Sequence, residues 1–177
     1  RSLNALQANE ALFFYRPVKP IDTVIARSVV ETGLYSLVLI VITGGIFLYK
    51  EKWVLDNFAL TAITFLSLSL CAMGTGISFM VAGHRYPFLN QLIPIVLRPF
   101  WFVSGVFYSL SSIPQWLRPL VSWNPILQAI ELTRHSFNSN YFISNSISLN
   151  YLMTCGIVSF TFGLWIYLNN EKILQTK

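Results

Sequence analysis

A single arginine, Arg98, lies near the middle of an otherwise apolar stretch that runs from Leu89 to Tyr108. An isolated charge at the centre of a bilayer costs at least about 2.5 kcal/mol, so it normally has a function or a partner. Arg98 could face a polar passage and bind an anionic substrate. It could equally pair with Glu31 on another apolar segment, or extend to the membrane surface. The sequence leaves these alternatives open.

Aromatic residues gather around the end of the same stretch: Phe100, Trp101, Phe102, Phe107, Tyr108, Trp116 and Trp123. Aromatic faces stack against the apolar C–H faces of sugars, so this group could form a carbohydrate-contacting surface. The alternative is the ordinary aromatic belt that membrane proteins place at the bilayer interface. On sequence alone, the belt is the favoured interpretation.

Few other residues suggest chemistry. Glu131 and Arg134 stand three positions apart and would meet on one face of a helix, where a local salt bridge is the simplest role. His84 and His135 lack the paired spacing of a metal site. No G-x-x-x-x-G-K-[ST] loop and no convincing Ser/His/Asp set occurs. We therefore predict no catalytic residue, no bound metal and no cofactor for this chain.

The elements that must position these residues are apolar. Hydrophobic residues make up 54% of the chain and charged residues 11%, against about 25% charged in soluble domains. A helix rises about 1.5 Å per residue, so about 20 apolar residues cross the hydrocarbon core. Four runs have this character, and only the third of them contains a charged residue, Arg98: Thr32–Tyr49, Asn57–Gly83, Leu89–Tyr108 and Tyr151–Leu168. The sequence predicts an all-α, polytopic transmembrane bundle with four spans.

The formal net charge of +5 does not indicate a nucleic-acid partner, because the basic residues are dispersed between the apolar runs. The distribution of Lys and Arg between the two sides of the membrane instead predicts how the spans are oriented. One side would hold Arg1, Arg16, Lys19, Arg27, Arg85, Lys172 and Lys177, and the other Lys50, Lys52, Arg118 and Arg134. The richer side should be cytoplasmic, which places both termini in the cytoplasm and the chain in a plasma membrane.

Three further segments have recognisable patterns. Ser2–Phe14 has the spacing of an amphipathic surface helix, and Arg16–Pro20 is a stiff proline elbow, after which Asp22 can cap the first spanning helix. Pro114–Ser122 and Pro125–Phe137 each resemble a helix too short to cross. A stripe of small residues in the second span should let another helix approach closely; its members are Ser67, Cys71, Gly74, Ser78 and Ala82.

At these residues the chain resembles the membrane subunits of ABC-2 type exporters, and most closely the capsular polysaccharide export permeases of Gram-negative bacteria. The resemblance covers nearly the whole chain. It is carried by Ala8-Asn9-Glu10, Tyr15-Arg16-Pro17-Val18-Lys19-Pro20-Ile21-Asp22, Ile25-Ala26-Arg27, Pro94 with Arg98-Pro99, Trp123-Asn124-Pro125, Glu131-Leu132-x-Arg134 and Ser148-Leu149-Asn150-Tyr151-Leu152. Members of that family have six spans, and this chain, which begins with Arg1, aligns with the last four, so we expect an N-terminally truncated transmembrane domain over residues 1–177.

The resemblance implies a homodimeric permease of the bacterial inner membrane that works with separate ATPase subunits. It implies that residues 2–22 form a cytoplasmic coupling segment and that residues 109–148 form a periplasmic gate region. The expected ATPase-coupling residues are Asn9, Glu10, Arg16, Lys19 and Asp22. The expected polysaccharide path contains Arg98, Phe100, Trp101 and Tyr108, and the expected gate contains Trp116, Trp123, Asn124, Glu131 and Arg134. Expected partners are the ATPase, a second copy, lipid, the polymer, and periplasmic or outer-membrane export proteins.

Other functions remain possible at this level. The same architecture would serve an exporter of O-antigen, teichoic-acid polymers or small hydrophobic compounds. An integral-membrane transferase should gather acidic or histidine residues near one membrane face, where this chain offers Glu31 and His84. A purely structural assembly subunit would need no ATPase partner.

Overall fold

The computed structural model describes residues 19–51, 53 and 55–175, and these are helical or irregular, with no strand among them. The helices follow one another in the order α2 (Pro20–Lys50), α3 (Phe58–Arg85), α4 (Leu89–Val103), the 3₁₀ turn η3 (Leu110–Ser112), α5 (Arg118–Ser122), α6 (Pro125–Phe137) and α7 (Leu149–Gln175). The predicted all-α class is confirmed for this part of the chain. The predicted amphipathic helix over 2–14, with Asn9 and Glu10, lies outside the described residues, as does Arg16 of the predicted elbow.

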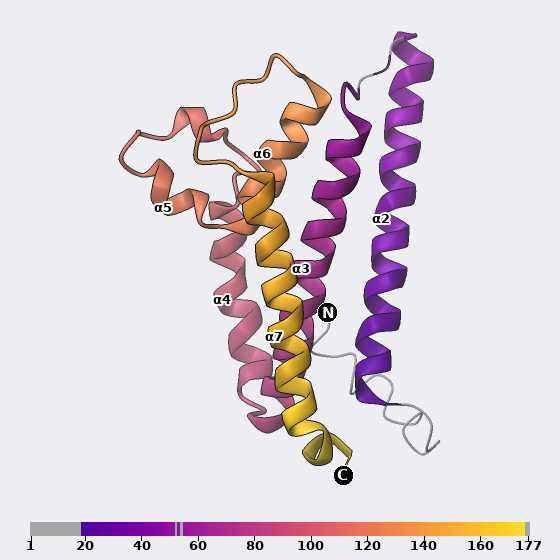
Figure 1. The fold of residues 1–177 in the computed structure, drawn as a ribbon, viewed down its shortest axis with the longest axis vertical. Helices are drawn as coiled ribbons and strands as arrows, with labels where there is room; N and C mark the ends of the chain where they lie inside the picture. The colour runs from indigo at the N-terminus through magenta and orange to yellow at the C-terminus, as the bar shows by residue number, and fades with distance from the viewer. Residues whose placement is uncertain (1–18, 52, 54, 176–177) are drawn as a thin grey trace.

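Helices α3 and α7 lie side by side at the centre of the bundle, with α2 on one side of them and α4 on the other (Figure 1). Helix α2 begins at the end of the bundle where α3 and α7 finish, which we call the terminal end. The opposite end, which we call the loop end, carries α5, α6 and the irregular segments around them (Figure 1). One buried apolar cluster lies at the terminal end and joins α2, α3 and α7. A second lies under α6 at the loop end.

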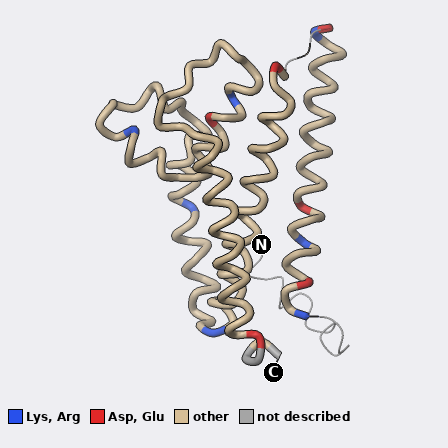
Figure 2. Tube along the Cα trace, in the orientation of Figure 1, with Lys and Arg blue, Asp and Glu red and all other residues tan. Residues whose placement is uncertain are grey.

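Three helices among the described residues are long and apolar enough to cross a bilayer. They are Pro20–Lys50, Phe58–Arg85 and Leu149–Glu171, with mean hydropathies of 1.9, 1.8 and 1.6 over their most apolar windows. Charged residues are correspondingly sparse along the middle of the bundle and more frequent towards its ends (Figure 2). These three segments agree with three of the four predicted runs.

The remaining predicted span, Leu89–Tyr108, forms a shorter helix than expected. Helix α4 has 15 residues and ends at Val103, not at Tyr108, which makes it about 22 Å long against a hydrocarbon core of about 30 Å. The chain turns at Gly105, whose φ of 77° is readily adopted only by glycine. The Ser104 hydroxyl donates to the Trp101 carbonyl oxygen in the last turn. The apolar run continues past this point, so composition alone could not show where the helix ends.

The predicted stripe of small residues on α3 faces α7. A Cβ atom built on Gly74 would overlap the backbone of Ser159, and one built on Gly163 would overlap the Gly74 carbonyl oxygen. The Ser159 hydroxyl donates to the Cys71 carbonyl oxygen across the same seam, at 3.1 Å. The two backbones therefore touch without intervening side chains, which is the packing that small residues permit in membranes.

The start of α2 is capped as the sequence predicts. The Lys19 backbone N–H donates to Asp22 Oδ2 at 2.9 Å, and the Asp22 N–H donates to the Lys19 carbonyl oxygen at 3.0 Å. Pro20 occupies the first helical position, where no N–H is needed. Asp22 thus has a structural role in the described part of the chain, independent of any contact with a partner.

Candidate functional site

The most elaborate polar arrangement in the described chain surrounds Glu131 on α6, whose side chain is only 1% exposed. Its Oε1 atom accepts from Arg134 Nη1 at 2.7 Å and from the Leu110 backbone N–H at 3.1 Å. Its Oε2 atom accepts from the Tyr141 hydroxyl at 2.9 Å. A buried carboxylate is tolerated only when it is paired and hydrogen-bonded in this way.

Arg134 extends the network to the end of α4. Its Nη2 atom donates to the Gly105 carbonyl oxygen at 2.7 Å, and its Nη1 atom donates to the Tyr108 carbonyl oxygen at 2.8 Å. These carbonyls follow the end of α4 and have no helical partner there. The planar fork of the guanidinium can serve several acceptors at once, which an ammonium would do less well. The predicted local salt bridge is confirmed, but it is also the clamp that fixes residues 105–110 against α6.

Tyr141 completes what we call the Glu131 cluster, defined as Glu131, Arg134, Tyr141 and Ser109. The Ser109 and Tyr141 hydroxyl oxygens lie 2.6 Å apart. Because the tyrosine donates its proton to Glu131, the serine must be the donor in this pair. The His135 Nδ1 atom lies 3.0 Å from the Tyr141 carbonyl oxygen and holds the same loop. Sequence reasoning missed Tyr141 and Ser109, because nothing in the local pattern links them to a glutamate on another element.

Helix α6 is fixed to its other neighbours as well. Asn124 Oδ1 accepts from the Ile126 N–H at 2.9 Å and caps the helix, so the Asn-Pro pair predicted for the gate is the helix start. Gln128, which is buried, donates to the carbonyl oxygens of Ser122 and Ser146 and accepts from the Ser148 N–H. These bonds tie α6 to the end of α5 and to the start of α7.

The loop end is also joined to the start of α3. Thr61 donates to the Ser136 hydroxyl at 2.7 Å. Asp56 Oδ2 accepts from the Ser139 N–H and hydroxyl at 2.7 and 2.8 Å. These two donors stabilise the carboxylate and lower the pKa of Asp56 below its ordinary value. The segment after α6 is therefore attached to the bundle on both sides.

The aromatic residues predicted for the path fall into two kinds. Phe100 and Trp101 are both more than half exposed on α4. The Trp101 ring meets Phe102 and Phe107 edge to face, with centroids 5.5 and 5.1 Å apart. Tyr108 differs from them, because it is half-buried and its hydroxyl donates to the Val103 carbonyl oxygen at 2.9 Å. We call the exposed group Phe100, Trp101, Phe102 and Phe107 the aromatic surface.

Trp116 and Trp123 flank α5 and are each 77% exposed. Leu120, which lies between them in the sequence, is also largely exposed. Their side chains contribute little to the packing of this chain on itself. The backbone around them is nevertheless fixed: Arg118 donates to the Ile113 and Ser111 carbonyl oxygens, each at 2.9 Å. The Trp123 carbonyl oxygen accepts from the Tyr151 hydroxyl at 2.8 Å.

The pair between Arg98 and Glu31, one of the predicted alternatives, does not form within the described chain. Glu31 accepts from Arg27 at 3.2 Å on the same helix, α2. Arg98 is exposed on α4, and α4 and α2 lie on opposite sides of α3 and α7 (Figure 1). That separation leaves the open passage and the membrane surface as the remaining interpretations for Arg98.

The sequence profile of the ABC-2 type transporters matches residues 10–138, which is more than half of the chain. The chain belongs to the ABC-2 type transporter family. The matched range contains α2, α3, α4 and α6, and so includes the Glu131 cluster apart from Tyr141.

Individual relatives match over almost the full length. The polysialic acid transport protein KpsM of Escherichia coli is 38% identical over 176 residues, which is 99% of this chain and 68% of that protein. The capsule polysaccharide export inner-membrane protein CtrC of Neisseria meningitidis is 25% identical, and BexB of Haemophilus influenzae, of the same description, is 22% identical. Each of these two covers 97% of this chain and 64% of the relative.

The membership fits what the site can do chemically. Glu131 and Arg134 bind each other and backbone groups, so their role is to hold neighbouring segments in place. They fix the loop end of α4 to α6, and through it to α3, α5 and α7. Arg98 and three residues of the aromatic surface, Phe100, Trp101 and Phe102, lie on α4, which buries none of its residues within the described chain.

Proposed function

We propose that this chain is the transmembrane permease subunit of an ATP-driven exporter that moves a capsular polysaccharide across the bacterial inner membrane. The observation that carries the proposal is the 38% identity to a polysialic acid transport protein over 99% of the chain. That match extends through the spanning helices and the loop end alike. ATP hydrolysis is assigned to a separate ATPase subunit, since no nucleotide-binding loop occurs in the sequence.

The proposed topology places the terminal end in the cytoplasm, with both termini there, and the loop end in the periplasm. The excess of Lys and Arg on the side of the terminal end supports this orientation. Helix α4 together with residues 104–108 would complete a fourth crossing. Helices α5 and α6 would then form the periplasmic gate, and the exposed Trp116 and Trp123 would lie at the membrane interface, which aromatic side chains favour.

The proposed path runs along α4, between this chain and a second copy. The structure describes all of helix α4, and none of its residues is buried. We therefore expect its exposed faces to contact something other than its own chain. The aromatic surface offers rings on which sugar C–H faces can stack. Arg98 would meet acidic groups of the polymer, which would repay part of its cost within the membrane. Periplasmic and outer-membrane export proteins would receive the polymer beyond the gate.

The coupling segment is assigned to residues 2–22, with Asn9, Glu10, Arg16, Lys19 and Asp22 as its contact residues. Of these, Lys19 and Asp22 lie in the described part of the chain. They sit at the start of α2, where the Lys19 N–H donates to Asp22 Oδ2 and caps the helix. The stiffness of the elbow sequence supports transmission of movement from an ATPase with little slack.

The experiment that tests the function is deletion and complementation in the source bacterium, with capsule on the cell surface as the readout. Deletion should abolish surface polymer and leave polymer inside the cell, and the tagged protein should co-purify with an ATPase subunit in detergent. Normal surface capsule in the deletion strain would overturn the proposal. Loss of polymer from both compartments would instead indicate a biosynthetic enzyme.

The aromatic surface gives a sharper prediction. Replacing Trp101 with alanine should lower surface polymer severalfold at normal protein levels, because a sugar could no longer stack on the ring. The guide to size is base–aromatic stacking in nucleic-acid binding, which is worth about 1–3 kcal/mol per base. The matched control is Trp165→Ala, since Trp165 is also well exposed but lies on α7. Equal losses of surface polymer in the two variants would mean that Trp101 belongs to the ordinary interfacial belt and not to the path.

A further inference from the structure

Helix α2 is attached to the bundle only at its beginning. Its buried residues are Pro20, Thr23 and Val24, and none of its later residues is buried, although the structure describes α2 throughout. Further along, a largely apolar cavity of about 230 Å³ separates it from α3 and α6, with Tyr35, Val38 and Thr64 among its lining residues. Packed contacts, which could transmit a displacement of α2 to its neighbours, are therefore concentrated in its first two turns.

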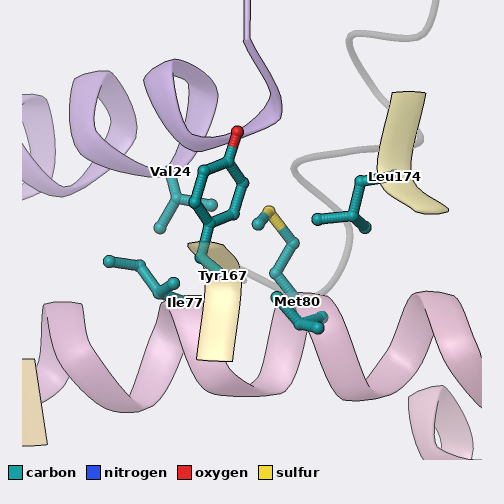
Figure 3. Close-up of a cluster of buried hydrophobic side chains, with 6 residues drawn as sticks. Val24, Ile77, Met80, Tyr167 and Leu174 are labelled. Carbon is teal, nitrogen blue, oxygen red and sulfur yellow. The ribbon is translucent and has the colours of Figure 1, made fainter. Parts of the chain in front are cut away.

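Those first turns meet the last turns of α7. Lys19 Nζ lies 3.0 Å from Glu171 Oε1. The same turns of α2 and α7 contribute to a buried cluster, formed by Val24 of α2, Ile77, Met80 and Val81 of α3, and Tyr167 and Leu174 of α7 (Figure 3). The hydrogen bond to Glu171 and the charge of that carboxylate raise the pKa of Lys19 above its ordinary value, so the Lys19 ammonium is charged at physiological pH.

The neighbouring position on α7 holds the end of α3. Arg85 Nη1 donates to Asn170 Oδ1 at 3.3 Å. Asn170 and Glu171 thus bind basic side chains from the end of α3 and the beginning of α2. The terminal turns of α7 are where the three long helices are joined.

The other end of α7 is joined to the proposed gate. The Tyr151 hydroxyl donates to the Trp123 carbonyl oxygen beside α5, and the Ser148 N–H donates to Gln128 of α6. Leu152 is fully buried in the cluster under α6. Between these ends α7 is one continuous helix of 27 residues, about 40 Å long, with its backbone against α3. A single rigid element therefore spans from Lys19 to α5 and α6.

We infer that Glu171 is a positioning residue that receives the movement of the elbow through Lys19, and that α7 carries this movement to the gate. This rests on the proposed function, in which the stiff elbow receives the movement of the ATPase. Helix α2 serves as the input only over its first turns. Its remaining length makes no buried contact with the other described segments of this chain.

Charge exchange tests the pair in the complete permease, purified with its ATPase and reconstituted in vesicles. Lys19→Glu and Glu171→Lys should each lower the polymer exported per ATP hydrolysed by about five- to tenfold, which is the lower end of the range of about 5–150-fold for coupling between sites. The double exchange Lys19→Glu with Glu171→Lys restores the ion pair in reverse and should recover most of the ratio. A purely structural role would shift the melting temperature without changing this ratio.

The matched control is Arg27→Glu, which changes the charge of the same end of α2 by the same amount. Arg27 pairs with Glu31 within its own helix, so this variant should keep the wild-type ratio. A double exchange no better than Lys19→Glu alone would overturn the inference and leave Lys19 as a direct ATPase contact. If the wild-type complex itself exports no polymer, the proposed function has failed instead.

The α7 route has its own test at the loop end. Tyr151→Phe removes the donor to the Trp123 carbonyl oxygen and leaves the ring in place. Export per ATP should fall while the rate of ATP hydrolysis stays at the wild-type value, because the input contact is intact. An unchanged ratio in Tyr151→Phe would exclude transmission through this contact.

Discussion

Replacing Glu131 with alanine is expected to destabilise the protein by about 3–5 kcal/mol, the range observed when one partner of a buried ion pair is removed. The variant leaves the partly buried Arg134 without its carboxylate, and it leaves the Leu110 N–H and the Tyr141 hydroxyl without their acceptor. The measurement is the thermal unfolding midpoint in detergent, followed by tryptophan fluorescence. We expect Glu131→Gln to lie between wild type and alanine, because the amide keeps an acceptor oxygen but loses the charge.

Two companion variants separate the effect of the ion pair on stability from the effect of side-chain shape. The double variant Glu131→Ala with Arg134→Ala should lose less than the sum of the two single losses, because no unpaired charge stays behind. Arg134→Lys keeps the charge but cannot reach Glu131 and the Gly105 and Tyr108 carbonyls with one planar fork. Full stability of Glu131→Ala would show that the cluster does not hold α4 to α6.

The sequence predicted well those features that depend on a long, repeated pattern. The uncharged run from Asn57 to Gly83 became α3, and the small residues at three- and four-residue spacing within it face α7. The proline after Asn124 marks the start of α6 at the predicted residue. Each of these signals repeats over several turns or uses a residue with a strong local preference.

The sequence predicted poorly those features set by contacts between distant segments. Helix α4 ends at Val103 because Gly105 turns the chain and Arg134 binds the carbonyls that follow, whereas the apolar run itself continues. Tyr141 reaches Glu131 from a loop, and Glu171 reaches Lys19 from the far end of the chain. Residue types at these positions are unremarkable, and only the fold brings them together.

The arrangement of the two buried clusters suggests how stability and movement are divided. The cluster at the loop end is reinforced by Glu131, Arg134 and Gln128, all bound to backbone groups. The cluster at the terminal end is apolar, and its polar contacts are the exposed pairs around Glu171 and Asn170. Exposed pairs form and break at little cost, usually below about 1 kcal/mol. Adjustment during transport is therefore expected at the terminal end, while the loop end moves as a unit.

Replacing Gly74 with alanine is the second substitution with a large expected effect. The added Cβ atom would overlap the backbone of Ser159, and backbone cannot rotate aside as a side chain can. Helix α7 would have to move away from α3 along the seam that joins the two ends of the bundle. Overpacking costs typically about 1–3 kcal/mol and more where nothing can yield, so we expect a clear loss of folded protein and a lower unfolding midpoint.

The control is the same chemical change at Gly44, on α2, where a Cβ atom would meet nothing within 4 Å. Alanine favours helix over glycine by up to about 1 kcal/mol, so Gly44→Ala should be neutral or slightly stabilising. The comparison isolates the close approach, because both variants add one methyl group to a helical glycine in an apolar span. Equal unfolding midpoints for Gly74→Ala and Gly44→Ala would mean that α3 and α7 are not in backbone contact, and the transmission proposed through α7 would then lose the packing that makes it rigid.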